Sequence, residues 1–187
     1  MSRTPLREAL HRLALEDLVE TVPQRGIFVA LLDPKEIYDN TVVREAVESE
    51  VLRRVIVNKV PIDYTQLDDL LARMEHSLEE PDAVAFLEAD EEFHLVLAAT
   101  AGNRPAFEAI RRSWIHVNRV RYLKHQPKQD LSAALIEHRA MVTGLRRGDP
   151  DRVEKAVRAH MDRSRARLDE LTKLIPDAFV TGRAQPS

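Results

Sequence analysis

The sequence is organised around residues 86–100, Phe86-Leu-Glu-Ala-Asp90-Glu-Glu-Phe93-His94-Leu-Val-Leu97-Ala-Ala-Thr100. Phe86, Phe93 and Leu97 recur at helical spacing, so they define a stripe that should face a hydrophobic core. Asp90 and His94 fall on the same stripe. Because residues four apart are neighbours on a helix, one carboxylate oxygen and one imidazole nitrogen can converge on a single point. This pair is half of a metal site.

Two later histidines have the same setting. In the helix expected over residues 132–147, His138 shares one face with Leu135, Val142 and Leu145, and in the helix after Pro150, His160 shares one face with Val153, Ala156, Val157, Ser164, Leu168 and Leu171. An unsatisfied buried polar group costs roughly 1–3 kcal/mol, and one shared metal ion would satisfy all of them. The sequence therefore predicts a metal site made of Asp90, His94, His138 and His160. In the simpler alternative, Asp90 and His94 only hydrogen-bond each other.

The composition limits the class of protein. The chain has 187 residues, a net charge of −3, 44% hydrophobic residues and only five glycines, which favours one substantial core in a mostly helical fold. Without cysteine, a metal must be held by nitrogen and oxygen. No apolar stretch is long enough to span a bilayer and the start lacks a signal peptide's apolar core, so we expect a cytoplasmic protein. The charge excludes a nonspecific nucleic-acid binder, although a local DNA-reading surface is compatible with it.

The N-terminal residues predict a short amphipathic helix over residues 2–13. Its polar side carries Arg3, Thr4 and Arg7, a set suited to phosphate and base-edge contacts when a helix N-terminus enters a major groove. Strands are expected over 18–22 and 27–30, joined through Pro23-Gln24-Arg25-Gly26. This order is typical of the back half of a winged helix-turn-helix.

The charge of this segment does not decide its role. Within residues 1–30, four arginines are balanced by four acidic residues, so the electrostatic signal for DNA is weak. A surface helix packed beside a hairpin explains the same residues equally well.

A second domain begins at Asp33-Pro34-Lys35-Glu36, which supplies an N-cap, a proline at the first helical position and a capping-box glutamate. The helix expected from here to about Lys59 carries Arg44 and Glu48 in an otherwise apolar stripe. Either the two residues form an ion pair on a partly exposed helix, or Arg44 faces a cavity and binds a ligand carboxylate through its guanidinium fork. We favour the second interpretation.

Six helices are expected after Asp33, with no strand among them. They form an antiparallel all-α bundle, so the chain is mostly α, with a partial winged helix-turn-helix before the bundle. We assign residues 1–32 to the partial winged helix-turn-helix, 33–174 to the metal-binding helical bundle, and 175–187 to a mobile tail.

Motifs in both parts of the chain resemble one family. Residues 2–10 resemble the start of the recognition helix of the GntR family of bacterial transcription regulators, and Gly26-Ile27-Phe28-Val29 resembles its wing. The FadR-like subfamily carries a C-terminal effector domain called FCD. Its pattern matches, in order and approximate spacing, Asp90-x-x-x-His94, Ala101-Gly102-Asn103, Glu137-His138, Gly148-Asp149 and His160.

The resemblance implies an effector-controlled transcription regulator, not an enzyme, that binds operator DNA as a homodimer. It assigns metal ligation to Asp90, His94, His138 and His160, with Zn, Ni or Mn as the divalent ion. It implies a small carboxylic acid effector, for which we expect contacts from Arg44, Asn103 and Arg119. It places Arg3, Thr4, Arg7, Arg25 and Gly26 against DNA.

The chain departs from the family pattern at its start. Two helices precede the recognition helix in the family, whereas here Met1 lies almost directly before it, so we expect a truncated module with Leu6, Leu10 and Leu13 exposed. Two other functions are open: a metal-dependent enzyme, or a stand-alone ligand-binding bundle that has lost DNA binding. The enzyme is less favoured because no general base is evident near the four predicted ligands, and Glu137 is expected to lie off the inward face.

Overall fold

The computed structural model describes residues 3–80, 82–123 and 127–180, which form seven α-helices, one antiparallel hairpin and a short 3-10 helix. The expected fold class is confirmed. The elements in chain order are α1 (Arg3–Leu15), β1 (Val19–Val22), β2 (Gly26–Val29), α2 (Pro34–Val57), α3 (Tyr64–Glu79), α4 (Ala83–Thr100), α5 (Arg104–Tyr122), α6 (Lys128–Arg147), α7 (Pro150–Leu174) and η1 (Pro176–Ala178).

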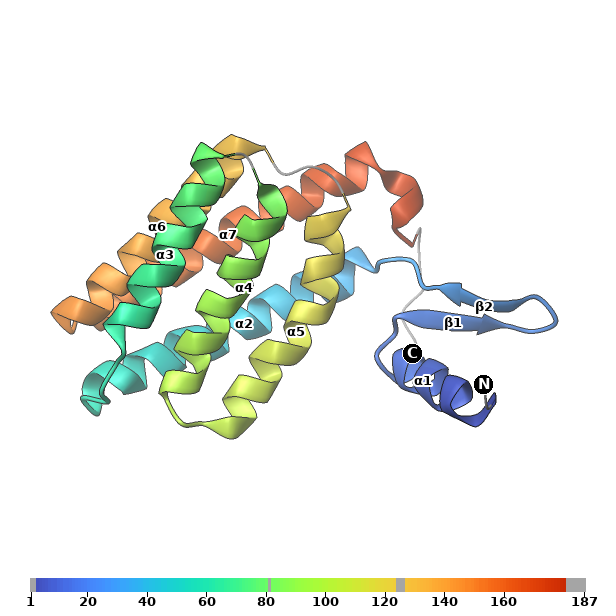
Figure 1. The fold of residues 1–187 in the computed structure, drawn as a ribbon, viewed down its shortest axis with the longest axis horizontal. Coiled ribbons are helices and arrows are strands. Elements are labelled where there is room, and N and C mark those ends of the chain that lie inside the picture. The colour runs from blue at the N-terminus through green and yellow to red at the C-terminus, as the bar shows by residue number, and fades with distance from the viewer. Residues whose placement is uncertain (1–2, 81, 124–126, 181–187) are drawn as a thin grey trace.

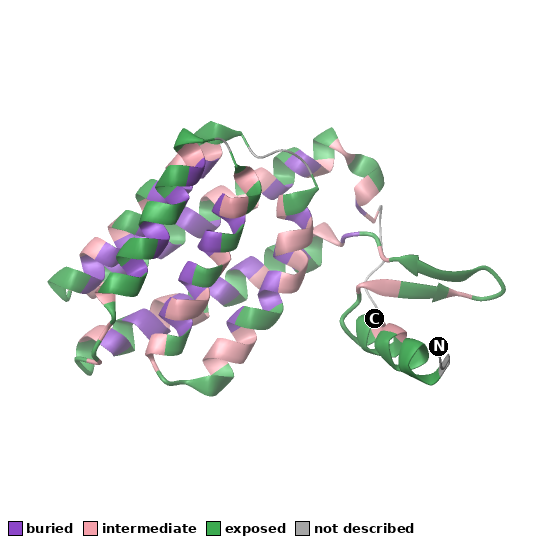
Figure 2. Cartoon of the chain, viewed as in Figure 1, coloured by how far each residue is buried: buried purple, intermediate pink, exposed green. Residues whose placement is uncertain are grey.

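Helices α2–α7 form one bundle, and α1 with the hairpin forms a small module beside it (Figure 1). The most extensive contacts join α3 with α4, α6 with α7, and α2 with both α7 and α5. Buried residues follow the inward stripes of the bundle helices, whereas α1 and the hairpin are mostly exposed (Figure 2). The core that positions the site therefore belongs to the bundle.

Local sequence explains where most bundle helices begin. The side chains of Asp33, Asp63, Asp82, Asn103 and Asp149 each accept a hydrogen bond from a backbone N–H of the first turn. Gly148 ends α6 with a φ of 62°, a left-handed conformation that glycine adopts without strain.

The start of α6 differs from the prediction of residue 132. The helix begins at Lys128, after Pro127, without a side-chain cap. Ser132 donates its hydroxyl to the Lys128 carbonyl and so lies inside the helix. A helix start without a capping side chain has no clear local signal, which is why the sequence placed it four residues late.

The small module pairs β1 with β2 from Val19 opposite Val29 to Val22 opposite Gly26. The apolar side of α1 is largely uncovered in the described residues, since Leu6 and Leu15 have 62% and 71% of their surface exposed. Of the three leucines expected to be exposed, Leu6 and Leu13 are exposed, whereas Leu10 is only partly exposed.

The C-terminal residues 175–180 do not form the expected mobile tail; residues 181–187 lie outside the described part of the chain. The Leu32 N–H donates to the Ala178 carbonyl, and the Val180 N–H donates to the Leu32 carbonyl, at 3.0 and 2.8 Å. Leu32 and Phe179 are both buried. We call residues 175–180 the strap, because they hold the linker that joins β2 to α2. Backbone pairing and burial of Phe179 order this segment.

Two groups of buried side chains make up the core of the bundle. One lies between α3, α4, α6 and α7 and includes Phe86, Phe93 and Met141. The other joins α2, α5 and α7 to Leu32 and Phe179.

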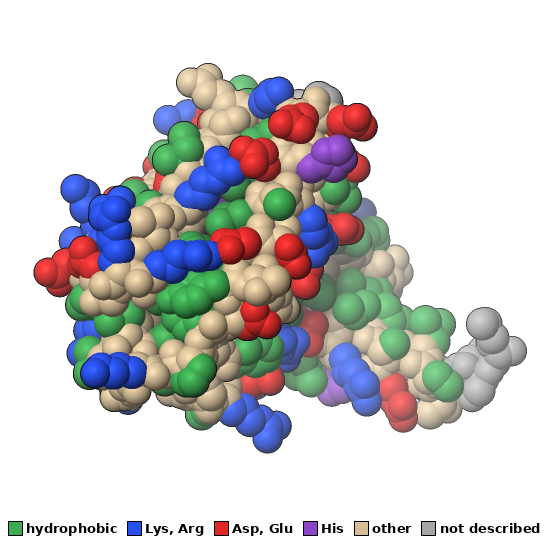
Figure 3. Space-filling view, turned by 60° about the vertical axis from the view of Figure 1, so that its left-hand side comes forward, with side chains coloured by type: hydrophobic (Ala, Val, Ile, Leu, Met, Phe, Trp, Pro, Cys, Tyr) green, Lys and Arg blue, Asp and Glu red, His purple; other side chains and the backbone are tan. Residues whose placement is uncertain are grey.

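The bundle surface carries mixed charge. On the face turned to the viewer in Figure 3, basic and acidic side chains lie side by side. Exposed ion pairs such as Arg73–Glu92 and Arg139–Glu75 link neighbouring helices. Among the described residues, no helix is both long and apolar enough to cross a membrane.

We expect Phe179→Ala to lower the free energy of unfolding by about 3 kcal/mol, because it removes a buried aromatic ring from the second core. Urea unfolding followed by circular dichroism measures the effect. The exposed neighbour provides a control, since Asp177→Ala should change the free energy by less than about 0.5 kcal/mol. Equal unfolding midpoints for the two variants would contradict a packed strap.

Candidate metal centre

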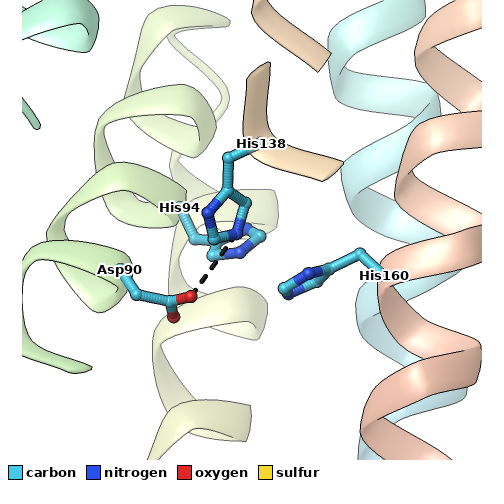
Figure 4. A group of neighbouring side chains, drawn as sticks. All are labelled: Asp90, His94, His138 and His160. Atoms are coloured by element: carbon cyan, nitrogen blue, oxygen red, sulfur yellow. Dashed lines mark ion pairs between the residues drawn. The ribbon is translucent and has the colours of Figure 1, made fainter. Parts of the chain in front are cut away.

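Four side chains from three helices converge in the middle of the bundle (Figure 4). Asp90 and His94 come from α4, His138 from α6 and His160 from α7. One candidate ligand atom from each residue lies within 4.8 Å of all the others, and none of the four residues has more than 3% of its surface exposed. The structure thus brings together all four residues that the sequence singled out. We call this group the Asp/His cluster.

The tautomer of His94 follows from its neighbour on α2. His94 Nδ1 lies 2.8 Å from Glu48 Oε2, so Nδ1–H donates to the carboxylate. Arg44 Nε donates to the other oxygen of Glu48 at 2.9 Å. His94 Nε2 is buried without a hydrogen-bond partner, so its lone pair is available within the cluster. His94 therefore pairs with Glu48, which does not support the simpler Asp90–His94 hydrogen bond.

His160 is oriented in the same way from the opposite side. Its Nδ1 lies 2.9 Å from Glu137 Oε2, and Arg163 Nη2 donates to the same oxygen at 2.8 Å. Arg163 Nη2 also lies 3.1 Å from His160 Nδ1. Arg163 Nη2 is a donor, and His160 Nδ1 is also a donor when it carries the proton, so the two nitrogens do not bond each other. Both donate to Glu137 instead. The lone pair of His160 is then on Nε2.

His138 and Asp90 complete the cluster. His138 Nε2 lies 3.4 Å from Asp90 Oδ1, the contact dashed in Figure 4, and both nitrogens of this imidazole are buried without a hydrogen bond. The other oxygen of Asp90 lies 2.7 Å from Arg121 Nη2. Asp90 is thus positioned between a cation and the histidines.

Burial controls the protonation of two of the imidazoles. Desolvation lowers the pKa of His138 to about 3, although the nearby Asp90 carboxylate acts in the opposite direction. Desolvation, together with the neighbouring histidines and arginines, also lowers the pKa of His160 well below its ordinary value. Both rings are therefore neutral at pH 7, the state that binds metal ions.

The carboxylates are kept ionised despite their burial. Burial alone would raise the pKa of Asp90, but Arg121, His138 and His94 outweigh it, so the pKa lies below its ordinary value. Burial also opposes ionisation of Glu48, yet Arg44 and His94 lower its pKa to about 2. An ionised carboxylate beside neutral imidazoles is a suitable set of metal donors.

The cluster fits a divalent metal ion on the evidence of its own atoms. Unpartnered imidazole nitrogens face an ionised carboxylate in a buried space, and each would otherwise cost roughly 1–3 kcal/mol. His94 and His160 each direct the second ring nitrogen to a carboxylate, an arrangement typical of histidines that bind metals. Three nitrogens and one oxygen suit Zn and its first-row neighbours.

A cavity of about 70 Å³, counted as the space open to the centres of water molecules, adjoins the Asp/His cluster. Its polar wall residues include Arg44, Asp90, Arg121, His160 and Arg167. Trp114 contacts two of the arginines, with its ring centre 4.0 Å from the Arg44 guanidinium carbon and 4.9 Å from that of Arg121. The cavity therefore combines cationic donors with an aromatic surface.

Of the three expected effector-binding residues, one lines the cavity and two do not. Arg44 is buried and lines the cavity. Asn103 and Arg119 do not line it: Asn103 caps α5 by accepting the Ala106 N–H, and Arg119 donates to the Ala30 carbonyl. Positions 119 and 121 are about 200° apart around a helix, so Arg121 lines the cavity instead.

Glu137 was expected to lie off the inward face, but its carboxylate accepts hydrogen bonds from His160 and Arg163. Its side chain has only 16% of its surface exposed. Glu137 points away from the inward stripe of α6 but toward α7. The spacing of His160 and Arg163 on α7 is the signal that could have found it, since the two residues share one acceptor.

The expected DNA-binding residues lie in the small module. Thr4 and Arg7 are on α1, and Arg25 and Gly26 are at the hairpin turn, where all four are exposed. Gly26 has a φ of 117°, which favours glycine. Arg3 begins α1, and its side chain lies outside the described part of the chain.

We expect the metal-free protein to lose roughly 2 kcal/mol of unfolding free energy between pH 7 and 5.5. His138 and His160 have lowered pKa values in the folded state, so the unfolded chain binds more protons below about pH 6.5. The free energy of unfolding therefore decreases as the pH is lowered. Urea titrations in chelator at the two pH values measure the change.

His138→Gln should remove about half of that pH dependence, whereas the exposed His76→Gln should leave it intact. A metal-free protein whose stability is flat or rises on acidification would contradict neutral buried histidines.

Comparisons with known proteins agree with both parts of the fold. A model of the FCD domain matches residues 39–163, and a model of bacterial regulatory proteins of the gntR family matches residues 1–29. The HTH-type transcriptional repressor RspR of Escherichia coli strain K12 is 29% identical over 161 residues, which cover 86% of this chain and 71% of the repressor. An HTH-type transcriptional regulator from an unstable DNA locus of Streptomyces ambofaciens is 30% identical over 98% of this chain and 77% of its own length.

A solved structure shares the fold at lower sequence identity. E. coli McbR/YncC superimposes with a TM-score of 0.79 at 19% identity, covering 91% of this chain and 86% of that chain. The bundle and the adjoining small module are therefore a known arrangement.

Proposed function

The chain belongs to the GntR family of bacterial regulatory proteins and carries its FCD domain, and on this premise we propose that it regulates transcription in response to a small organic acid. In this proposal residues 1–32 contact operator DNA, and residues 33–174 bind a divalent metal ion and the acid. The observation that carries it is the Asp/His cluster, whose buried donors adjoin a cavity lined by arginines.

The metal ion is held by Asp90, His94, His138 and His160. Zn is the first candidate because three imidazoles and one carboxylate suit it, and Ni or Mn accept the same donors. A divalent ion held by these residues would supply a Lewis acid for an oxygen donor of the effector. Glu48 and Glu137 hold His94 and His160 in the tautomers that leave Nε2 free for the metal.

Arg44 anchors the carboxylate of the effector. Its Nε is used by Glu48, whereas Nη2 is buried without a hydrogen-bond partner and the residue lines the cavity. A ligand carboxylate at this position would accept a charge-assisted hydrogen bond beside the Asp/His cluster. The stacked Trp114 keeps the guanidinium in place.

The second core connects the cavity to the DNA-reading module. Ile37, Trp114, Val117, Val120, Leu168 and Leu171 line the cavity and also belong to the core that contains Leu32 and Phe179. Leu32 lies in the linker after β2, and Arg119 holds the Ala30 carbonyl in the same linker. Filling the cavity changes the packing around Leu32 and so biases the orientation of the hairpin and α1.

Operator contact is assigned to Arg3, Thr4, Arg7, Arg25 and Gly26. A homodimer presents two copies of this small module to paired half-sites. An effector that reorients each copy changes the fit to both half-sites together.

A metal-dependent enzyme is less well supported. The carboxylates nearest the Asp/His cluster, Glu48 and Glu137, are each engaged by an arginine and a histidine. A general base needs a free lone pair within reach of the substrate. The regulator is therefore the function we favour.

We expect His138→Ala and His160→Ala each to weaken metal binding by roughly tenfold or more, because each removes one of four donors. Metal content of the purified variants, measured by inductively coupled plasma mass spectrometry after equilibration with limiting Zn, tests this. His76→Ala, which alters an exposed histidine on α3, is the matched control. Normal metal content in both cluster variants would refute the site.

Arg44→Gln should weaken binding of small carboxylic acids by roughly tenfold while leaving metal content unchanged. Glutamine can still donate to Glu48, so the buried carboxylate keeps a partner. Calorimetric titration of the zinc-loaded protein with acetate and longer acids measures the loss. Arg53→Gln, at an exposed position on the same helix, should bind these acids like the parent. If Arg44→Gln does so too, Arg44 is not the anchor.

A further inference from the structure

The cavity wall presents hydrogen-bond donors that have no acceptor. Among the described wall residues, Arg44 Nη2, Trp114 Nε1 and Arg167 Nε are buried without a partner. The wall also contains two acids, but Asp90 is paired with Arg121 and Asp130 lies 3.8 Å from Arg167 Nη1. The unpartnered groups are hydrogen-bond donors that need acceptors, so the cavity suits a ligand rich in anionic oxygens.

These donors lie at two separate levels of the bundle. His160, Ser164, Arg167 and Leu168 all line the cavity from one face of α7. Arg167 follows His160 by about two helical turns, which is roughly 10 Å along the axis. Arg44 contacts Glu48, the partner of His94, so it belongs to the level of the Asp/His cluster. Arg167 is the donor at the other level.

The guanidinium of Arg167 has different surroundings on its two sides. Nη1 faces the more exposed acids Asp130 and Glu170, whose side chains have 36% and 55% of their surface exposed. Nε is buried, and the side chain as a whole is only 13% exposed. The two acids thus hold the guanidinium at the rim and leave Nε for a ligand.

Arg163 cannot serve the same purpose. It also lines the cavity, but its Nε and Nη2 both donate to Glu137 at 2.8–3.0 Å. Arg167 is therefore the arginine of α7 with an unpartnered buried donor in the described cavity wall.

The cavity wall also contains apolar side chains from three helices. Val117 and Val120 of α5, Leu131 and Ala134 of α6, and Leu168 of α7 all line the cavity. Such a wall accepts methylene groups and disfavours a second charge in the middle of a ligand. The cavity thus has a cationic group at each level, and apolar side chains form part of its wall.

We propose that Arg167 forms a second anion-binding subsite, so that the cavity selects a short dicarboxylate over a monocarboxylate. One carboxylate lies at Arg44 and the Asp/His cluster, the other accepts a hydrogen bond from Arg167 Nε, and the methylene spacer lies against the apolar side chains of the wall. This inference rests on the proposed function, since it takes the first carboxylate site from it and adds the ligand class.

Calorimetric titration of the zinc-loaded full chain tests the subsite. The probes are butanedioate and pentanedioate, each compared with the monoacid of the same length, butanoate and pentanoate. The parent should bind the diacids at least tenfold more tightly. Arg167→Gln should abolish this preference while changing monoacid affinity less than about twofold, because it removes one charge-assisted hydrogen bond.

Two further variants complete the experiment. Arg158→Gln, at an exposed position on the same helix, should leave both affinities unchanged. Arg167→Lys keeps the charge without the guanidinium fork, so it should retain part of the preference. It also provides the comparison if circular dichroism shows that Arg167→Gln is unfolded.

The outcomes distinguish a failure of the Arg167 subsite from a failure of the proposed function. Equal parental affinity for diacids and monoacids, or a full diacid preference in Arg167→Gln, overturns the second subsite and leaves the proposed function standing. If neither class of acid binds the folded, zinc-loaded parent, the acid-binding part of the proposed function falls, and the subsite falls with it.

Discussion

Three imidazoles and a carboxylate share one buried point, and the rest of the site depends on the groups that orient them there. Glu48 fixes the ring of His94 and Glu137 fixes that of His160, so the lone pairs of these two rings face inward. These contacts join α2, α4, α6 and α7 at a single level. Packing that separated any of these helices would leave a buried polar group alone, at a cost comparable to a large core substitution. The site and the helix arrangement are therefore specified together.

Three carboxylates at or beside the Asp/His cluster are each paired with an arginine farther out. Arg44 pairs with Glu48, Arg163 with Glu137, and Arg121 with Asp90. All three arginines also line the cavity, so the groups that neutralise the buried carboxylates present cationic surface to a ligand. Removing one member of such a buried pair leaves an uncompensated charge, which is far more costly than losing a surface ion pair. Ligand binding and the stability of the bundle thus draw on the same charged groups.

The second core extends this arrangement toward the small module. Its side chains contact the cavity on one side and Leu32 and Phe179 on the other, while backbone hydrogen bonds tie the strap to the linker. Close-packed side chains transmit displacement because they leave little free volume to absorb it. The strap therefore makes Leu32 of the linker part of the bundle core. The hairpin ends only a few residues before Leu32.

The sequence by itself determined the helical bundle, the hairpin and the inward placement of Asp90, His94, His138 and His160, because helical periodicity and Asp or Asn caps act over a few residues. It also indicated Arg44, an arginine in an apolar stripe. The tertiary structure decided what depends on neighbouring elements: Glu137 reaches a histidine on α7, Arg121 lines the cavity in place of Arg119, and Asn103 caps α5 away from that cavity. Residues 175–180 are ordered by Leu32, which is distant in sequence. Local patterns specify which face of a helix is buried, but only packing specifies which side chain that face meets.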